Sequence, residues 1–289
     1  MNLIRKDVDI NILEERIIKP SIKVENPKHI VLVHGFATDS RCWDIYVNQS
    51  KENYLYLINL PGHGNHDYQP IELSFEYIVS LVKEYVKSVN FKTGEKIVLM
   101  GHSYGGAISS VVANELENEG LDIIEKLILL APYSMFSIVK AIDKIYLFNV
   151  KDADSFNKLQ EIIFNNAKNS LIALEKFLYK KLSMDFFKKN MKNFKWVIVG
   201  MSLPSTFFKI NQAFKNIGYK SYFLFGENDK LIDNSRTIKR ASSTFNIKPY
   251  VSIYENCGHA FFVEESDKFF NEIKDCLLYT SPSPRDRSL

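Results

Sequence analysis

The chain has 289 residues, which is enough for one large domain or two small ones. Its 37 basic and 34 acidic residues leave a net charge of +3, which does not indicate the strongly basic surface of a nucleic-acid-binding protein. Hydrophobic residues make up 46% and charged residues 25% of the chain, so the composition favours a folded globular protein over a disordered one.

No segment of the sequence has the pattern of a membrane span or of a secretory signal. Long apolar runs, such as residues 30–33 and 127–131, are far shorter than the roughly 18 residues that a span needs. Residues 1–18 carry charges throughout and lack the apolar core of a signal peptide. Three cysteines are too few for a disulfide framework. We therefore expect a cytoplasmic protein.

Six short apolar runs rich in β-branched residues predict buried strands. Nearly continuous apolar runs are typical of parallel strands whose two faces are both covered. Helical patterns lie between them; after Ser74, apolar residues follow the i, i+3, i+4 spacing from Phe75 to Val89. This alternation predicts a mostly parallel α/β sheet flanked by helices, with right-handed crossovers. The predicted strands span residues 30–33, 54–59, 96–100, 126–131, 221–225 and 250–254.

The alternation stops between residues 133 and 215, where helical patterns follow one another without a clear strand, apart from a short candidate at 196–199. We interpret residues 133–215 as a helical cap inserted into a core domain that spans residues 1–132 and 216–275. The predicted cap holds fourteen lysines and six acidic residues, a net charge of +8. Two prolines follow an amphipathic helix at 265–275. We expect residues 276–289, which resemble a translated sequencing adapter, to be a non-native or disordered tail.

The clearest chemical motif is a glycine-flanked serine between a predicted strand and a predicted helix. A nucleophile in such a turn needs small residues two positions before and after it, as Gly101 and Gly105 are. Ser103 would present its hydroxyl at a helix N-terminus, where the dipole favours developing negative charge. A glycine turn without chemistry is the alternative, but the flanking strand and helix favour a nucleophile. The motif comprises Gly101, His102, Ser103, Tyr104, Gly105 and Gly106.

Candidates for a base and for its orienting acid follow this motif, as serine catalysis requires. Asp229 comes after the strand predicted at 221–225, at the sheet edge where parallel α/β folds keep their sites. His259 comes after the next strand, and it is the only one of the six histidines that follows Asp229. Glu227 and Asp233 remain alternatives for the acid.

A third element, His34-Gly35-Phe36, follows the first predicted strand directly. Acyl transfer needs two donors directed at the oxyanion, and Gly35 would let the backbone N–H of Phe36 face the serine together with that of Tyr104. His34 is better explained as a structural histidine bonded to neighbouring backbone than as a base. The loop that contains His63 lacks the cysteine or carboxylate cluster of a zinc site, so we expect no metal.

Together these motifs resemble those of the α/β-hydrolase superfamily, in particular the small serine esterases and lipases with a helical cap. The resemblance covers nearly all of the predicted core domain, and its four motifs occur in the family's order. It implies an α/β-hydrolase sheet with the cap inserted after the sixth strand. It implies Ser103 as nucleophile, His259 as base, Asp229 as orienting acid, and the amides of Phe36 and Tyr104 as the oxyanion hole. It implies no cofactor.

The resemblance favours hydrolysis of a carboxylic ester through an acyl-enzyme. A carbon–carbon bond hydrolase or a perhydrolase with the same triad is the alternative, and a catalytically silent binding protein is a more distant one. One departure is Asn59, where many family members carry aspartate; it puts a loop contact in question and leaves the triad intact.

The composition of the predicted cap bears on the partners. Most of its aromatic residues should pack within the cap itself, but such a cap fits an apolar acyl or alkyl chain better than a sugar or a peptide. Its excess of lysine suits weak association with an anionic membrane surface, with a merely solvated lysine face as the alternative. The expected partner is thus a small apolar ester, and the sequence does not define the oligomeric state.

Overall fold

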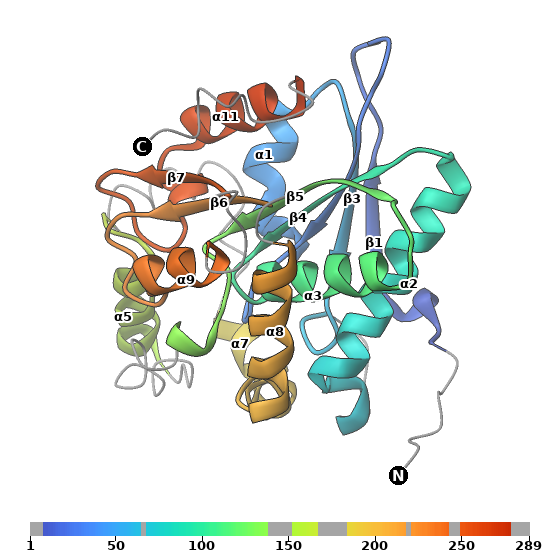
Figure 1. Cartoon of the computed structure of the whole chain (residues 1–289). Helices are drawn as coiled ribbons and strands as arrows, with labels where there is room; N and C mark the ends of the chain where they lie inside the picture. The colour runs from blue at the N-terminus through green and yellow to red at the C-terminus, as the bar shows by residue number, and fades with distance from the viewer. Residues whose placement is uncertain are drawn as a thin grey trace.

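The computed structural model describes residues 8–64, 68–137, 152–166, 184–217, 221–242 and 249–278. A seven-stranded sheet forms the centre of the molecule, with helices on both of its faces (Figure 1). The strands are β1 (Glu14–Ile18), β2 (His29–Val33), β3 (Tyr54–Asn59), β4 (Ile97–His102), β5 (Ile124–Leu130), β6 (Ser221–Gly226) and β7 (Tyr250–Tyr254). Their order is β1-β3-β2-β4-β5-β6-β7, and all neighbours are parallel except β1 and β3. The predicted parallel α/β sheet is confirmed.

All six predicted strands are present, and the ends of β3 and β7 fall at the predicted residues. The strands β2, β4 and β6 are buried along their whole length, which explains their continuous apolar runs. The sequence analysis missed the antiparallel edge strand β1, whose residues alternate between half-buried and exposed.

Strand β1 is held in place by polar partners from distant parts of the chain. Arg16 forms an ion pair with Asp44, and the Tyr85 hydroxyl donates a hydrogen bond of 2.6 Å to Glu15. Charged residues in a row, without an apolar alternation, gave no strand signal in the sequence.

Helices cover the two faces of the sheet unequally (Figure 1). The helices α1 (Asp44–Gln49) and α11 (Ser266–Leu278) pack together on one face, while α2 (Phe75–Thr93), α3 (Tyr104–Asn118) and α8 (Pro204–Ile217) form a row on the other. Helix α2 begins as predicted, because Ser74 Oγ accepts a hydrogen bond from the Tyr77 N–H. The smaller elements are η1 (Ile10–Ile12), η2 (Ser40–Trp43), η3 (Pro70–Leu73), α9 (Asn234–Ala241) and α10 (Phe261–Glu264).

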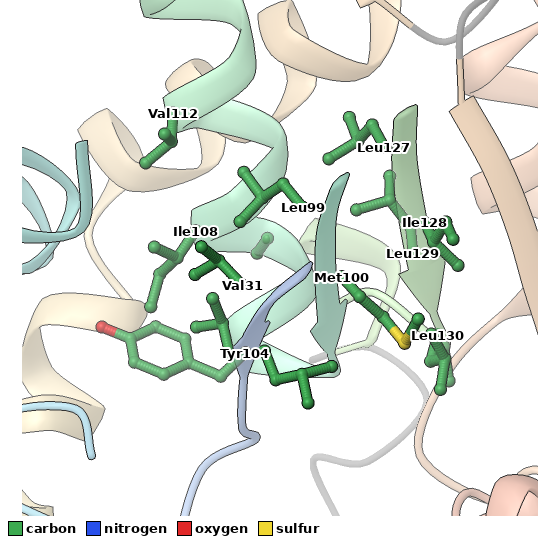
Figure 2. Packing of buried hydrophobic residues seen from close by; sticks show 14 of the residues in the cluster. Val31, Leu99, Met100, Tyr104, Ile108, Val112, Leu127, Ile128, Leu129 and Leu130 are labelled. Atoms are coloured by element: carbon green, nitrogen blue, oxygen red, sulfur yellow. The ribbon is translucent and has the colours of Figure 1, made fainter. Parts of the chain in front are cut away.

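The core between α3 and the sheet fixes where the turn before α3 can lie. Figure 2 shows Val31 and Leu99 of the central strands facing Tyr104 and Ile108 of α3, and all four side chains are fully buried. Each fully buried side chain of this size contributes about 1.5–3 kcal/mol relative to exposure. The first turn of α3 is therefore anchored on the two central strands.

A helical segment separates β5 from β6 in the chain, as predicted. Its described helices are α5 (Ala153–Ile163), α7 (Met184–Met201) and α8, while residues 138–151 and 167–183 lie outside the described residues. Among the described strands the segment follows the fifth in chain order, not the sixth that we expected. The domain boundary at residue 215 stays a prediction; α8 extends across it and packs against α3.

Two further details differ from the sequence analysis. Residues 196–199, the short strand candidate, lie inside α7, because Phe194, Val197 and Gly200 are buried at helical spacing. Helix α11 extends to Leu278 and buries Leu277, so the chain stays helical beyond the predicted tail boundary at 276. Residues 279–289 lie outside the described residues. Across the described helices, none is both long and apolar enough to cross a bilayer.

Candidate active site

Ser103 lies in a strained turn between β4 and α3. Its φ of 53° and ψ of −116° lie in a region that residues other than glycine rarely adopt, at a typical cost of about 1–3 kcal/mol. A Cβ atom on Gly101 would lie 2.4 Å from the Gly105 carbonyl oxygen, and one on Gly105 would lie 2.3 Å from the carbonyl oxygen of Val33. Only glycine allows these approaches, which is the requirement that the sequence motif predicted.

Backbone hydrogen bonds hold this turn on both sides. The Ser103 N–H donates to the Leu130 carbonyl of β5 at 2.8 Å. The Ser103 carbonyl accepts from the N–H groups of Ala107, at 3.1 Å, and Tyr133, at 3.0 Å. The backbone at Ser103 is thus fixed by the neighbouring strand, by its own helix and by the chain that leaves β5.

Asp229 and His259 form a buried pair at the ends of β6 and β7. The His259 Nδ1–H donates to Asp229 Oδ2 at 2.7 Å, and the two residues are 5% and 2% exposed. The other carboxylate oxygen of Asp229 accepts from the backbone N–H groups of Leu231, at 2.7 Å, and Ile232, at 2.9 Å. These bonds orient the carboxylate, which in turn orients the imidazole and makes its Nε2 the candidate base.

The two alternative acids have other partners. Glu227 accepts a hydrogen bond of 3.0 Å from the backbone N–H of Asn256. Asp233 caps α9 by accepting from the Arg236 N–H at 3.0 Å. Among the three candidates, Asp229 is therefore the one with a hydrogen bond to His259.

The loops after β2 and β7 both lie against the Ser103 turn. The His102 Nε2–H donates to the His259 carbonyl at 3.1 Å, and the two imidazole rings are 4.7 Å apart. A Cβ atom on Gly35 would lie 3.3 Å from Ser103 Cβ. Ser103, His259 and Gly35 therefore meet at one end of the sheet, as the sequence motifs predicted.

Two backbone amides are candidates for binding an oxyanion. Tyr104 is the first residue of α3, so its N–H has no acceptor within the helix. Its side chain points into the core (Figure 2), and burial raises the pKa of its hydroxyl. Phe36 follows Gly35, and its ring contacts the rings of His63 and Phe194, with centroids 5.7 and 5.2 Å away. The Phe36 ring thereby links this loop to α7.

His34 and His63 are fully buried neutral side chains beneath that loop. The His34 Nδ1–H donates to the Gly35 carbonyl at 2.7 Å, and its Nε2 accepts from the Leu60 N–H at 2.9 Å. This is the bonding expected of a structural histidine. Burial lowers the pKa of His34 to about 4. Burial and the neighbouring His34 lower the pKa of His63 to about 3.

Asn59, the departure from the family pattern, uses both groups of its amide. Its Oδ1 accepts from the Ser40 N–H at 2.8 Å, and its Nδ2–H donates to Glu14 Oε2 at 3.0 Å. An aspartate here would place a second carboxylate against Glu14. The neutral amide of Asn59 therefore avoids repulsion with the Glu14 carboxylate on β1. Its two hydrogen bonds go to Ser40 and Glu14, not to Ser103, Asp229 or His259.

The sequence analysis also missed Glu264, which accepts a hydrogen bond from the backbone of Gly258, the residue before His259. An acid five residues after the candidate base was the available signal. Within the described ranges, no group of three His, Cys, Asp or Glu side chains is placed to bind a metal ion.

We predict that the buried histidines make the fold sensitive to acid. Below about pH 6.5 the unfolded chain protonates these side chains while the folded chain keeps them neutral. The free energy of unfolding should fall between pH 6.5 and 4, by up to about 1.4 kcal/mol per pH unit for each histidine. Urea unfolding of wild type and His63→Asn across this range measures the effect, since asparagine keeps a donor for the Pro61 carbonyl. The variant should lose stability less steeply; parallel curves would contradict a buried neutral His63.

Comparisons with known proteins agree with this geometry. A sequence model described as the alpha/beta hydrolase family matches residues 30–273. Over 288 residues the chain is 24% identical to the protein named "Putative esterase/lipase 3" of Mycoplasma pneumoniae, and the alignment covers 96% of each chain.

Solved structures share the fold at lower identity. A thermophilic esterase from Thermogutta terrifontis gives a TM-score of 0.65 at 15% identity, covering 93% of this chain and 94% of that one. A meta-cleavage product hydrolase from Pseudomonas fluorescens IP01 gives 0.64 at 10% identity, covering 92% and 94%. At such identities the likeness shows the fold alone. The family match, in contrast, spans the turn at Ser103 and the pair of Asp229 and His259, and the chain therefore belongs to the alpha/beta hydrolase family.

Proposed function

We propose that this protein is a serine hydrolase that cleaves carboxylic esters through an acyl-enzyme. The observation that carries the proposal is the buried His259–Asp229 hydrogen bond next to the strained turn at Ser103. Family membership and relatives named esterase/lipase support a hydrolase of esterase/lipase type. No cofactor is needed for this chemistry, because the nucleophile, base and oxyanion donors all come from the chain.

In the proposed reaction, Ser103 Oγ attacks the ester carbonyl carbon while His259 Nε2 takes the hydroxyl proton. Asp229 stabilises the resulting imidazolium through its hydrogen bond to Nδ1. The tetrahedral oxyanion accepts hydrogen bonds from the amides of Phe36 and Tyr104. His259 then gives the proton to the departing alkoxide, leaving an acyl group on Ser103. In the second half of the cycle, His259 takes a proton from water while the water oxygen attacks the acyl carbon. The bond from that carbon to Ser103 Oγ then breaks, the imidazolium returns the proton to Oγ, and the acid leaves.

An apolar substrate is favoured by the side chains that meet the Phe36 loop. Leu159 of α5 and Phe187 and Phe194 of α7 form a buried cluster with Ala37, and Phe36 packs against it. Aromatic and aliphatic walls of this kind suit an acyl or alkyl chain. Carbon–carbon hydrolysis is the runner-up, supported by structural neighbours named meta-cleavage product hydrolase.

We also propose that the lysine-rich cap associates weakly with anionic membrane surfaces. On α7, Trp196 and Val199 are 45% and 51% exposed, and Lys192 and Lys195 are exposed on the same helix. An exposed tryptophan beside cations suits the interface of an anionic bilayer, where the ring meets the headgroup level and the lysines meet the phosphates. A surface of this type would bring the enzyme to apolar esters held in lipid.

Replacing the nucleophile tests the proposed function. Ser103→Ala should lower turnover of p-nitrophenyl esters by about 10⁴-fold or more, because only binding and the oxyanion donors remain. A series of esters of increasing acyl length, assayed with both proteins, reports the acyl preference. The thermal unfolding midpoint should stay near that of wild type. Substantial turnover by the folded variant would reject Ser103 as nucleophile, and preferential turnover of an extended diketone would favour carbon–carbon hydrolysis.

Substitutions at the three acids test the orienting residue. Asp229→Asn should reduce kcat by about 10⁴-fold, since the neutral amide neither fixes the imidazole tautomer nor stabilises the imidazolium. Glu227→Gln and Asp233→Asn are matched controls, because each replacement keeps an oxygen that accepts the backbone hydrogen bond of the original. In steady-state kinetics, the kcat of both controls should be close to that of wild type. A larger loss in Asp233→Asn than in Asp229→Asn would reassign the acid.

Vesicle assays test the membrane proposal. Turnover of an apolar ester should be faster in phosphatidylglycerol vesicles than in phosphatidylcholine vesicles. The difference should fade as salt shortens the Debye length from about 10 Å at 0.1 M to about 3 Å at 1 M. The double change Lys192→Glu and Lys195→Glu should remove the preference without changing the turnover of a small soluble ester. The control changes are Lys51→Glu, just before β3, and Lys92→Glu, in the last turn of α2; both lysines are exposed near the other ends of the strands. They should keep the preference. Equal rates on both vesicle types at low salt would reject the proposal.

A further inference from the structure

The carboxylate of Glu264 connects two segments that are about a hundred residues apart. Its Oε2 accepts a hydrogen bond of 2.5 Å from the Gly258 N–H. Its Oε1 accepts from the N–H groups of Asn165, at 2.8 Å, and Asn166, at 3.1 Å. Hydrogen bonds to an ionised acceptor are about twice as strong as neutral ones. One side chain thus ties the chain after α5 to the residue that precedes His259.

Further hydrogen bonds join the same two segments on either side of His259. The Ala260 N–H donates to the Ile163 carbonyl at 3.1 Å, and the Asn165 side-chain amide donates to the Asn256 carbonyl at 2.6 Å. A Cβ atom on Gly258 would lie 2.7 Å from Asn165 N. The two backbones are therefore in direct contact, and residues 163–166 form one wall of the His259 loop.

The other side of this loop rests on the core of the molecule. The Asn228 N–H donates to the Cys257 carbonyl at 2.8 Å, and His102 donates to the His259 carbonyl. These contacts hold the loop against the turn of Asp229 and against the Ser103 turn. The wall of residues 163–166 contacts the loop from the helical segment between β5 and β6, and Glu264 joins this wall to the loop.

We propose that Glu264 is a positioning residue, which holds the His259 loop so that the imidazole Nε2 faces Ser103. This inference rests on the proposed function and adds a residue that touches neither the substrate nor the reacting atoms. Its effect is geometric: a misplacement of about 1 Å at a reacting group can cost about 10²-fold in rate. Glu264 would therefore act on kcat more than on KM, because its loss moves the proposed base and leaves the apolar cluster at Phe36 unchanged.

Variants at two adjacent glutamates test the proposal in the full chain. Glu264→Ala should lower kcat for a p-nitrophenyl ester by about 10- to 100-fold, with KM within about twofold of wild type. Glu264→Gln keeps one of the two acceptor oxygens, so its kcat should lie between those of wild type and Glu264→Ala. The matched control is Glu265→Ala, because Glu265 is the next residue in the chain and its side chain is exposed. It should behave as wild type.

A spectroscopic readout separates this proposal from the proposed function. The low-field proton NMR signal of His259 Nδ1–H, which donates to Asp229, should shift or broaden in Glu264→Ala and stay unchanged in Glu265→Ala. The signal can be recorded in the Ser103→Ala background, so it does not depend on which residue is the nucleophile. If Glu264→Ala fails to fold, Glu264→Gln decides. A folded variant with wild-type kcat and an unchanged signal, or a loss that lies wholly in KM, would overturn the proposal.

Discussion

The close approach of three backbone segments around Ser103 is the constraint on which the rest of the site depends. Strand β4, the first turn of α3 and the end of β2 meet here. A Cβ atom on Gly101 would collide with the Gly105 carbonyl, and one on Gly105 would collide with the Val33 carbonyl. This contact forces Ser103 into its unusual backbone conformation. The buried interface between α3 and the central strands, shown in Figure 2, stabilises the arrangement by more than the local strain costs.

The pair of His259 and Asp229 is built differently from the serine turn. The Ser103 turn combines close backbone contacts at glycines with backbone hydrogen bonds, whereas the loops after β6 and β7 also depend on hydrogen bonds to side-chain carboxylates. The carboxylates of Asp229 and Glu264 each accept hydrogen bonds from at least two backbone N–H groups, and each lies beside the His259 loop.

The sequence predicted the parts of this structure that local rules determine. Continuous apolar runs identified six strands, and the glycine spacing around Ser103 identified the turn, because both follow from packing within a few residues. Strand β1 was missed since its stability comes from Arg16 and Glu15 meeting partners far away in the chain. The hydrogen bonds of Glu264 were missed for the same reason, because its carboxylate accepts from the N–H groups of Asn165 and Asn166, which belong to a distant segment. Residues 196–199 misled because β-branched side chains favour strands, yet tertiary packing made them helical.

The helices between β5 and β6 contact the two halves of the site in two chemically distinct ways. Helix α7 places Phe194 against the ring of Phe36, an apolar contact that depends on dispersion and burial. The end of α5 instead forms directed hydrogen bonds around His259, which fix distance and angle. A change in the α7 contact would therefore act on the Phe36 loop, while the hydrogen bonds around His259 stay in place. A change after α5 alters the geometry of the base itself. The position of a substitution within this helical segment thus decides whether it acts on the apolar contact at Phe36 or on the hydrogen bonds around His259.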